Sequence, residues 1–113
     1  MLTMMTRKPD ALQGTLDLLV LTTLSRGALH GYAIANHIQV VSDEVLRVEE
    51  GSLYPALHRM EAAGWISAEW SISDQNRRAR VYSITRAGRR HLDEERDKWQ
   101  RLSKAVGKLL RYA

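Results

Sequence analysis

Residues 51–66 read GSLYPALHRMEAAGWI, and this stretch decides the fold. Leu53, Leu57 and Met60 recur at steps of four and three, which is the spacing of one buried face of an α-helix. Three further residues, Tyr54, His58 and Arg59, lie off that face. The stretch therefore predicts a helix with one side in a core and a second side whose purpose the rest of the chain must explain.

The predicted helix runs from Ser52 to Ala63. The Ser52 hydroxyl is placed to cap its N-terminus, and Pro55 then falls in the first turn, where an amide has no partner within the helix. Gly64 is predicted to end the helix in the left-handed conformation. The proline is therefore compatible with this helix.

Length and composition describe one small protein domain. The chain has 113 residues, of which 44% are hydrophobic and 27% charged, as in ordinary globular proteins. It contains no cysteine, which excludes disulfides and thiolate sites. Residues 1–9 lack the continuous apolar core of a signal peptide and are expected to be a flexible N-terminus. We therefore expect a cytoplasmic protein.

Positive charge is concentrated in one segment. The net charge is +4, yet residues 77–90 alone hold six arginines and no acidic residue. Arginines gathered in this way repel one another, and a polyanion that neutralises them relieves the repulsion. Nucleic acid is the first candidate for such a partner.

The other segments show clear periodicities. Three more helices, a short extended segment and an alternating hairpin are expected, with Thr85 capping the last helix. Their predicted ranges are 11–25 and 30–42 for two helices, 42–50 for the extended segment, 66–71 and 78–84 for the hairpin strands, and 86–110 for the last helix.

This order predicts a mainly α fold with a small β-hairpin, namely a winged helix-turn-helix followed by a long C-terminal helix. The DNA-binding domain would span residues 10–85 and the dimerisation helix residues 86–113. In such folds the third helix enters the major groove of DNA, and the hairpin, or wing, reaches the flanking backbone.

The sequence resembles the PadR-like transcriptional regulators over roughly residues 11–110. The stretch GSLYPALHRMEAAGWI carries the resemblance, together with HGYAIANHI before it and RARVYSITRAGRRHL after it. Members of this family are bacterial homodimeric regulators, and most of them are repressors. The resemblance implies such a regulator, of the short subfamily with a single C-terminal dimerisation helix. The wing departs from the family pattern, because no glycine lies between Trp65 and Ala87 and the usual Tyr-Tyr pair reads Val81-Tyr82.

The predicted DNA contacts come from the third helix and the wing. Hydroxyls and arginines suit phosphate contacts, and the forked guanidinium of Arg59 also matches guanine in the major groove. A merely solvated polar face is the alternative for both segments. The predicted DNA-binding residues are Ser52, Tyr54, Pro55, His58, Arg59, Arg77, Arg78 and Arg80.

An apolar seam of coiled-coil spacing runs along the last helix, and a second copy of the same helix is its expected partner. The predicted dimer-interface residues are Leu92, Trp99, Leu102, Val106 and Leu109. Trp99 either packs in this seam or lines a pocket for a flat aromatic effector. A two-fold dimer would place two recognition helices roughly 34 Å apart and would require an inverted-repeat operator.

No catalytic, metal or cofactor site is predicted. The four histidines, His30, His37, His58 and His91, do not have metal-ligand spacing, and no nucleophile motif or phosphate-binding glycine loop is present. The sequence thus predicts a homodimeric, sequence-specific DNA-binding regulator that represses from a palindromic operator. Two alternatives remain open: a winged-helix module that binds another protein and little DNA, and an enzyme that uses the histidines.

Overall fold

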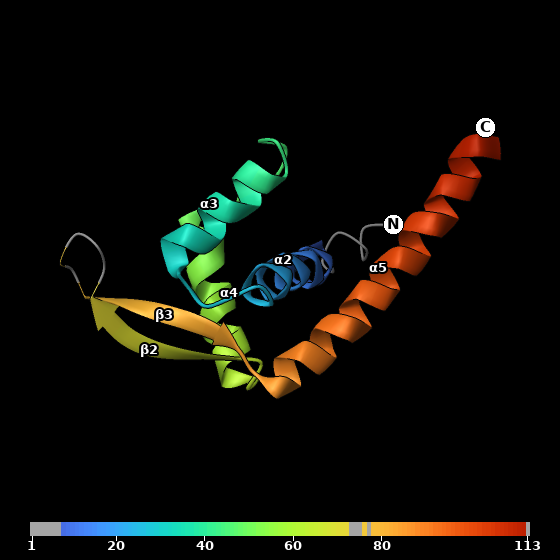
Figure 1. Cartoon of the computed structure of the whole chain (residues 1–113). Coiled ribbons are helices and arrows are strands. Elements are labelled where there is room, and N and C mark those ends of the chain that lie inside the picture. The colour runs from blue at the N-terminus through green and yellow to red at the C-terminus, as the bar shows by residue number, and fades with distance from the viewer. Residues whose placement is uncertain (1–7, 73–75, 77, 113) are drawn as a thin grey trace.

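The computed structural model describes residues 8–72, 76 and 78–112, and for residues 8–13 it describes the backbone alone. These residues form four helices and three strands (Figure 1). In chain order they are α2 (Lys8–Leu24), β1 (Leu29–His30), α3 (Gly31–Val41), α4 (Glu50–Ala62), β2 (Ile66–Ile72), β3 (Arg78–Ile84) and α5 (Arg86–Tyr112). The mainly α class and the hairpin are confirmed.

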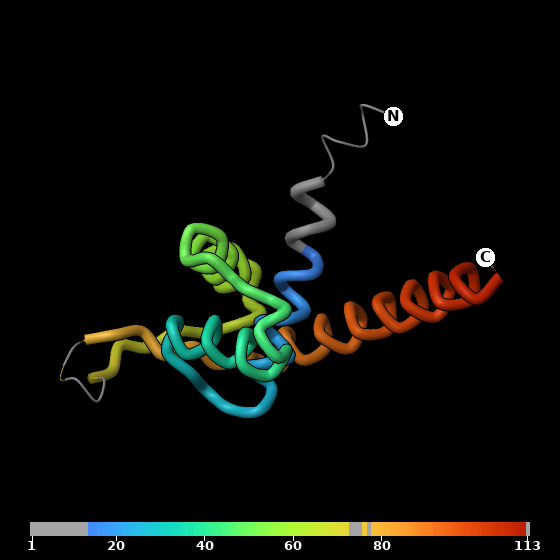
Figure 2. Tube along the Cα trace, turned by 90° about the horizontal axis from the view of Figure 1, so that it is seen from above, coloured from blue at the N-terminus to red at the C-terminus, as the bar shows by residue number. Residues whose placement is uncertain are grey.

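Helix α2 is the central element of the domain. It packs against α3, α4 and α5, and the antiparallel sheet of order β1-β3-β2 lies beside this group. Two perpendicular views show the wing projecting from one side of the helices and the C-terminal part of α5 projecting from the other (Figures 1 and 2). The wing and the C-terminal part of α5 thus project away from each other, although β3 leads directly into α5.

The core contains the predicted face of α4. Leu53, Leu57 and Met60 are buried, as their spacing predicted. They pack with buried side chains from α2, α3, the sheet and the start of α5, so the helices share one core. The other buried apolar residues are Val20, Leu21, Leu24, Ile34, Ile38, Ala56, Ile66, Tyr82 and Leu92.

Gly64 and Thr85 form the corner where α4, the hairpin and α5 meet. Gly64 has φ 83° and ends α4 in the left-handed conformation, as predicted. The Thr85 hydroxyl accepts a hydrogen bond from the Gly88 amide at 3.0 Å and donates one to the Gly64 carbonyl at 2.6 Å. Thr85 therefore caps α5, as predicted, and also ties it to the end of α4.

The predicted start of α4 was wrong. The helix begins at Glu50, and Glu49 occupies the capping position without a side-chain hydrogen bond. Ser52 is therefore inside the first turn, and Pro55 lies in the second turn, where its nitrogen has no hydrogen to donate to the Gly51 carbonyl. Gly51 is exposed, so water can satisfy that carbonyl. A carboxylate at Glu50 also interacts favourably with the helix dipole.

The extended segment predicted for residues 42–50 was also wrong. The third strand lies earlier, at Leu29–His30, and pairs antiparallel with Tyr82 and Val81 of β3. Residues 42–49 instead form the turn between α3 and α4. Two residues were too few to show a period in the sequence, whereas pairing with β3 satisfies their backbone groups.

At its N-terminal end, α2 begins at Lys8, so the last two residues of the predicted flexible N-terminus are helical. Residues 1–7 and the predicted wing contact Arg77 lie outside the described residues. In the part of the chain that the structure describes, no helix is both long and apolar enough to cross a membrane.

Candidate nucleic-acid interface

One side of α4 is exposed along the length that the sequence singled out. Ser52, Tyr54, Pro55 and His58 all face solvent, on the side of the helix opposite the core. Tyr54, Pro55 and His58 also line one shallow depression with Arg59 and Ala62. Burial against the domain, with a smaller effect of the Glu50 charge, raises the pKa of Tyr54 above its usual value of 10.0. The hydroxyl therefore stays protonated at neutral pH and can donate to an anion.

Gly31 at the start of α3 sets the position of Tyr54. A Cβ built on Gly31 would lie 2.8 Å from Tyr54 Cε1 and 2.9 Å from its hydroxyl oxygen. The absence of a side chain therefore lets the tyrosine ring rest on the backbone of α3. This contact links the exposed side of α4 to the first helix of the helix-turn-helix pair.

Arg59, for which the sequence predicted a contact to a base or to a phosphate, has its guanidinium on a carboxylate of its own chain. Its Nη1 donates to Asp17 Oδ2 at 3.0 Å and its Nη2 to Asp17 Oδ1 at 2.7 Å. Asp17 lies on α2 and is only 5% exposed. The hydrogen bond to Asp17 raises the pKa of Arg59, while burial opposes the rise. The terminal fork of Arg59 is thus occupied inside the protein.

The two predicted wing arginines that the structure describes, Arg78 and Arg80, differ in whether a carboxylate of the same chain holds the guanidinium. Arg80 Nη2 lies 2.9 Å from Glu61 Oε2 on α4, and Arg80 Nε is buried without a hydrogen-bond partner. The Arg78 guanidinium lies 4.7 Å from the centre of the Trp70 ring, a cation–π distance, and Arg78 is exposed. Arg78 therefore presents its charge to solvent, whereas Arg80 joins the wing to α4.

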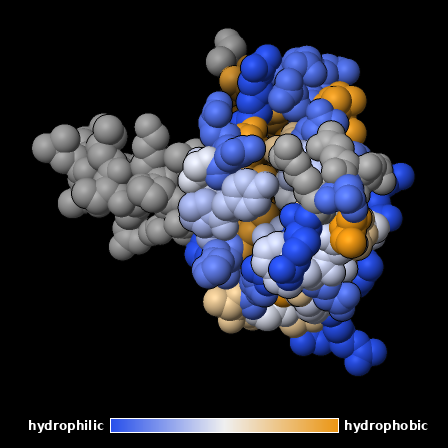
Figure 3. All heavy atoms as spheres, turned by 90° about the vertical axis from the view of Figure 1, so that its left-hand side faces the viewer, coloured by the Kyte–Doolittle hydropathy of each residue, from blue (hydrophilic) through white to orange (hydrophobic). Residues whose placement is uncertain are grey.

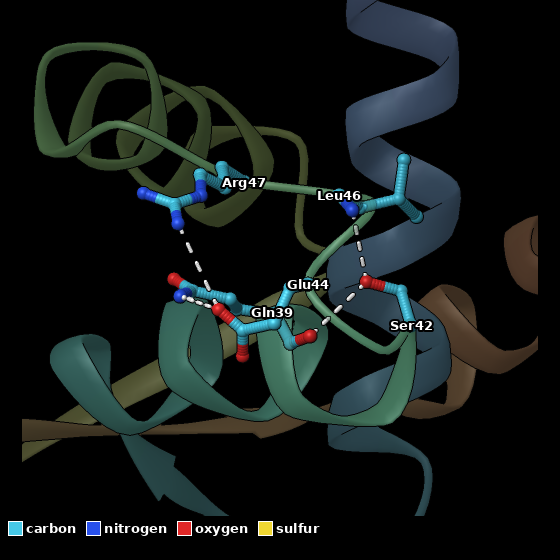
Figure 4. A network of polar contacts seen from close by, with 5 residues as sticks. All are labelled: Gln39, Ser42, Glu44, Leu46 and Arg47. Atoms are coloured by element: carbon cyan, nitrogen blue, oxygen red, sulfur yellow. Dashed lines mark hydrogen bonds and ion pairs between the residues drawn. The ribbon is translucent and has the colours of Figure 1, made fainter.

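The turn between α3 and α4 is built from side-chain hydrogen bonds (Figure 4). The Ser42 hydroxyl accepts a hydrogen bond from the backbone amide of Leu46 at 2.9 Å. The side-chain amide of Gln39 donates one to the Glu44 carboxylate at 2.6 Å. Asp43 and Glu44 have φ values of 54° and 69°. This left-handed backbone costs non-glycine residues on the order of 1 kcal/mol each, which the hydrogen bonds help to offset. The turn therefore fixes how the chain enters α4.

The predicted seam on α5 divides into two parts. Leu92 is buried in the core of its own chain, which removes it from the surface available to a partner. Trp99, Leu102, Val106 and Leu109 lie further along the helix and are exposed, as are Leu110 and Tyr112. An apolar side of a long helix is thus left uncovered where α5 leaves the domain.

A pocket of about 430 Å³ lies beside Trp99, between α2, α3 and the middle of α5. Its walls are mainly apolar and include Leu18, Leu19, Val41 and Leu46, while His37 and Arg96 supply polar atoms. A cavity of this kind suits an apolar or aromatic small molecule.

Among the described residues, no group of three or more histidines and carboxylates could hold a metal ion.

The model of the transcriptional regulator PadR-like family matches residues 20–94. The chain belongs to this PadR-like family. It is 43% identical over 68 residues to a transcriptional regulator of Mycobacterium tuberculosis, and the match covers 60% of this chain and 63% of the relative. The chain thus matches less than two thirds of the length of that curated relative. Members of the PadR-like family are transcriptional regulators and not enzymes.

Solved structures of PadR proteins share the fold. The PadR family regulator of Eggerthella lenta is 32% identical, with a TM-score of 0.72 and coverage of 96% of this chain and 93% of that one. Bacillus subtilis PadR, in complex with operator DNA, is 22% identical, with a TM-score of 0.64 and coverage of 71% of this chain and 44% of that one. The second likeness concerns the fold alone.

In this PadR-like chain the wing carries two exposed apolar residues that sequence reasoning did not place in the site. Trp70 and Ile72 lie on β2 opposite Arg80 and Arg78, and Trp70 is 61% exposed. Alternation along β2 predicted a half-buried strand, but the hairpin extends past the core, so only its base is covered. The face seen from the wing side is largely hydrophilic, with separate apolar areas (Figure 3).

Proposed function

We propose that this PadR-like protein is a homodimeric, sequence-specific DNA-binding regulator that represses transcription by occupying an inverted-repeat operator in the cytoplasm. The main observation in support is the exposed side of α4, which carries Ser52, Tyr54, Pro55 and His58. Next to it lies the wing, whose Arg78 presents its charge to solvent. This is where a winged helix-turn-helix meets the major groove and its flanking phosphates. The B. subtilis relative on operator DNA supports the same use of the fold.

Roles on the DNA follow from the donors that each side chain offers. Ser52 and Tyr54 carry hydroxyls suited to phosphate oxygens, and His58 can donate to or accept from a base edge. Pro55 gives the helix surface a flat apolar contact beside them. Arg78 and Arg77 contact the backbone through the wing, with Arg78 held over Trp70.

The exposed apolar side of α5 supports the dimer. Trp99, Leu102, Val106 and Leu109 would be buried against the same residues of a second copy, because a two-fold axis makes one surface complementary to itself. Two recognition helices would then meet successive major-groove faces, so the operator would be an inverted repeat. A small aromatic effector bound beside Trp99 would alter the packing of α2 and α5 and release the DNA.

The same apolar helix favours one competing function, a module that binds another protein through α5 and DNA weakly. Fluorescence-anisotropy titration with genomic fragments separates the two. A regulator binds one fragment at least about a thousandfold more tightly than random duplex and loses affinity steeply with salt. A protein-binding module would bind all fragments alike and weakly.

Replacing Arg78 with alanine is expected to weaken binding to operator and random DNA by the same factor. A phosphate contact carries no sequence information, and the loss of one contact from each protomer should reduce the slope of log affinity against log salt by about 1.8 for the dimer. Arg111→Ala removes the same charge at the far end of α5 and serves as the control. An unchanged slope in Arg78→Ala would contradict a phosphate contact from this residue.

A further inference from the structure

Helix α4 is tied to the elements on its two sides by ion pairs. Arg59 reaches back to Asp17 on α2 through two hydrogen bonds, at 2.7 and 3.0 Å. Glu61 reaches the other way to Arg80 on β3, at 2.9 Å. Successive helix residues are about 100° apart, so Arg59 and Glu61 project about 200° apart around the axis. The two pairs therefore restrain the rotation of α4 between α2 and the wing.

Asp17 is placed so that it cannot touch DNA. It is 5% exposed on α2, and both of its carboxylate oxygens accept from Arg59. An end-on contact from Arg59 to guanine would use the nitrogens Nη1 and Nη2, which already donate to that carboxylate. Taking Arg59 away from Asp17 would leave a buried charge without its partner, which is strongly unfavourable. The buried pair thus favours a role for Arg59 in positioning α4 over a direct contact from Arg59 to a base.

Rotation of α4 decides what its exposed side meets in the major groove. Tyr54 and His58 lie on the outer surface of the helix, so turning the helix moves them across the base edges. Binding groups must be held to within roughly 0.5 Å and 10–20° to make directed hydrogen bonds. A helix restrained on both sides meets that requirement before DNA arrives.

We propose that Asp17 and Glu61 are positioning residues for operator recognition, acting through Arg59 and Arg80 to fix the rotation of α4. This inference rests on the proposed DNA-binding function. It assigns specificity to two carboxylates that act through arginines of their own chain. It also explains why Arg59 and Arg80, which the sequence placed in the interface, hold carboxylates of their own chain.

The variants Asp17→Asn and Glu61→Gln test this proposal because each keeps the side-chain shape and removes the charge. Removing an acidic charge anywhere raises general affinity for DNA, so Asp93→Asn, on the exposed side of α5, is the matched control. The operator is first selected from genomic DNA with the parent protein. Anisotropy titrations against operator and scrambled duplex at several salt concentrations then give the specificity ratio and the salt slope, with circular dichroism to confirm folding.

Asp17→Asn and Glu61→Gln are expected to lower the specificity ratio at least tenfold while the salt slope stays within error of the parent. Asp93→Asn should keep the ratio. Adding Arg59→Gln to Asp17→Asn should cause little further loss, since both changes break one pair. A repeated selection with Asp17→Asn should return a relaxed motif, which a loss of stability alone would not produce in folded protein.

Two results would overturn the proposal. One is an unchanged ratio in the folded variants. The other is a higher specificity ratio in Asp17→Asn than in the parent and in Asp93→Asn, which would mean that Asp17 withholds a base-reading Arg59. If Asp17→Asn does not fold, Glu61→Gln decides, because its pair is partly exposed. A parent protein that selects no fragment would refute the proposed function instead, so the two failures are distinguishable.

Discussion

Replacing Leu102 with aspartate is expected to make the protein monomeric and to lower its operator affinity by at least about 100-fold. Leu102 lies in the middle of the exposed apolar side of α5 and is 57% exposed in a single chain. A carboxylate there would have to be desolvated in the seam without a partner. Without the dimer the second half-site no longer binds at high effective concentration, a gain worth about 10²- to 10⁴-fold in linked binders.

Sedimentation velocity measures the monomer directly, and anisotropy titration measures the loss of operator binding. Lys104→Gln is the control, since it changes the net charge by the same amount and lies about 200° around the helix from Leu102. The control should remain dimeric. A Leu102→Asp variant that sediments as a dimer of parental stability would show that the seam is not the dimer interface.

Replacing Gly88 with alanine is expected to destabilise the fold by about 3 kcal/mol, the upper end of the range for overpacking. A Cβ at this position would lie 2.0 Å from the Trp65 carbonyl oxygen and 2.8 Å from Ile84 Cγ1. The carbonyl has little freedom to move, because it accepts a hydrogen bond from the Thr85 amide at 3.0 Å. The methyl group would therefore push α5 away from the corner between α4 and the hairpin.

Chemical denaturation measures this effect, with Gly107→Ala in the same helix as the control. The nearest atom to a Cβ at Gly107 is a side-chain nitrogen of Arg111 at 3.7 Å, which is ordinary contact. Alanine is a better helix former than glycine, so the control should be unchanged or more stable by up to about 1 kcal/mol. A Gly88→Ala protein as stable as the parent would refute the close contact at this corner.

Much of the fold was predictable because its signals are local and periodic. Leu53, Leu57 and Met60 showed the buried side of α4, and Gly64 and Thr85 marked its end and the start of α5. The start of α4 was missed because Ser52 is a better capping residue by type than Glu49, yet the helix extends past it. Strand β1 was missed because its two residues show no period.

The site was less predictable because its organisation depends on distant residues. Arg59 and Asp17 are 42 positions apart, so residue type alone placed Arg59 in the DNA interface and said nothing of its partner. Leu92 fits the period of the α5 seam, but the period cannot tell which stretch of the helix packs on its own domain. Exposure of Trp70 likewise depends on how far the hairpin extends beyond the core.

Hydroxyl-radical footprinting on the most tightly bound genomic fragment tests the central claim most directly, namely that two copies of α4 and the wing read an inverted repeat. The expected result is two protected stretches related by two-fold symmetry, with centres one helical turn, or roughly 34 Å, apart. Flanking protection should weaken in Arg78→Ala. A single asymmetric stretch, or uniform protection of every fragment, would contradict the account.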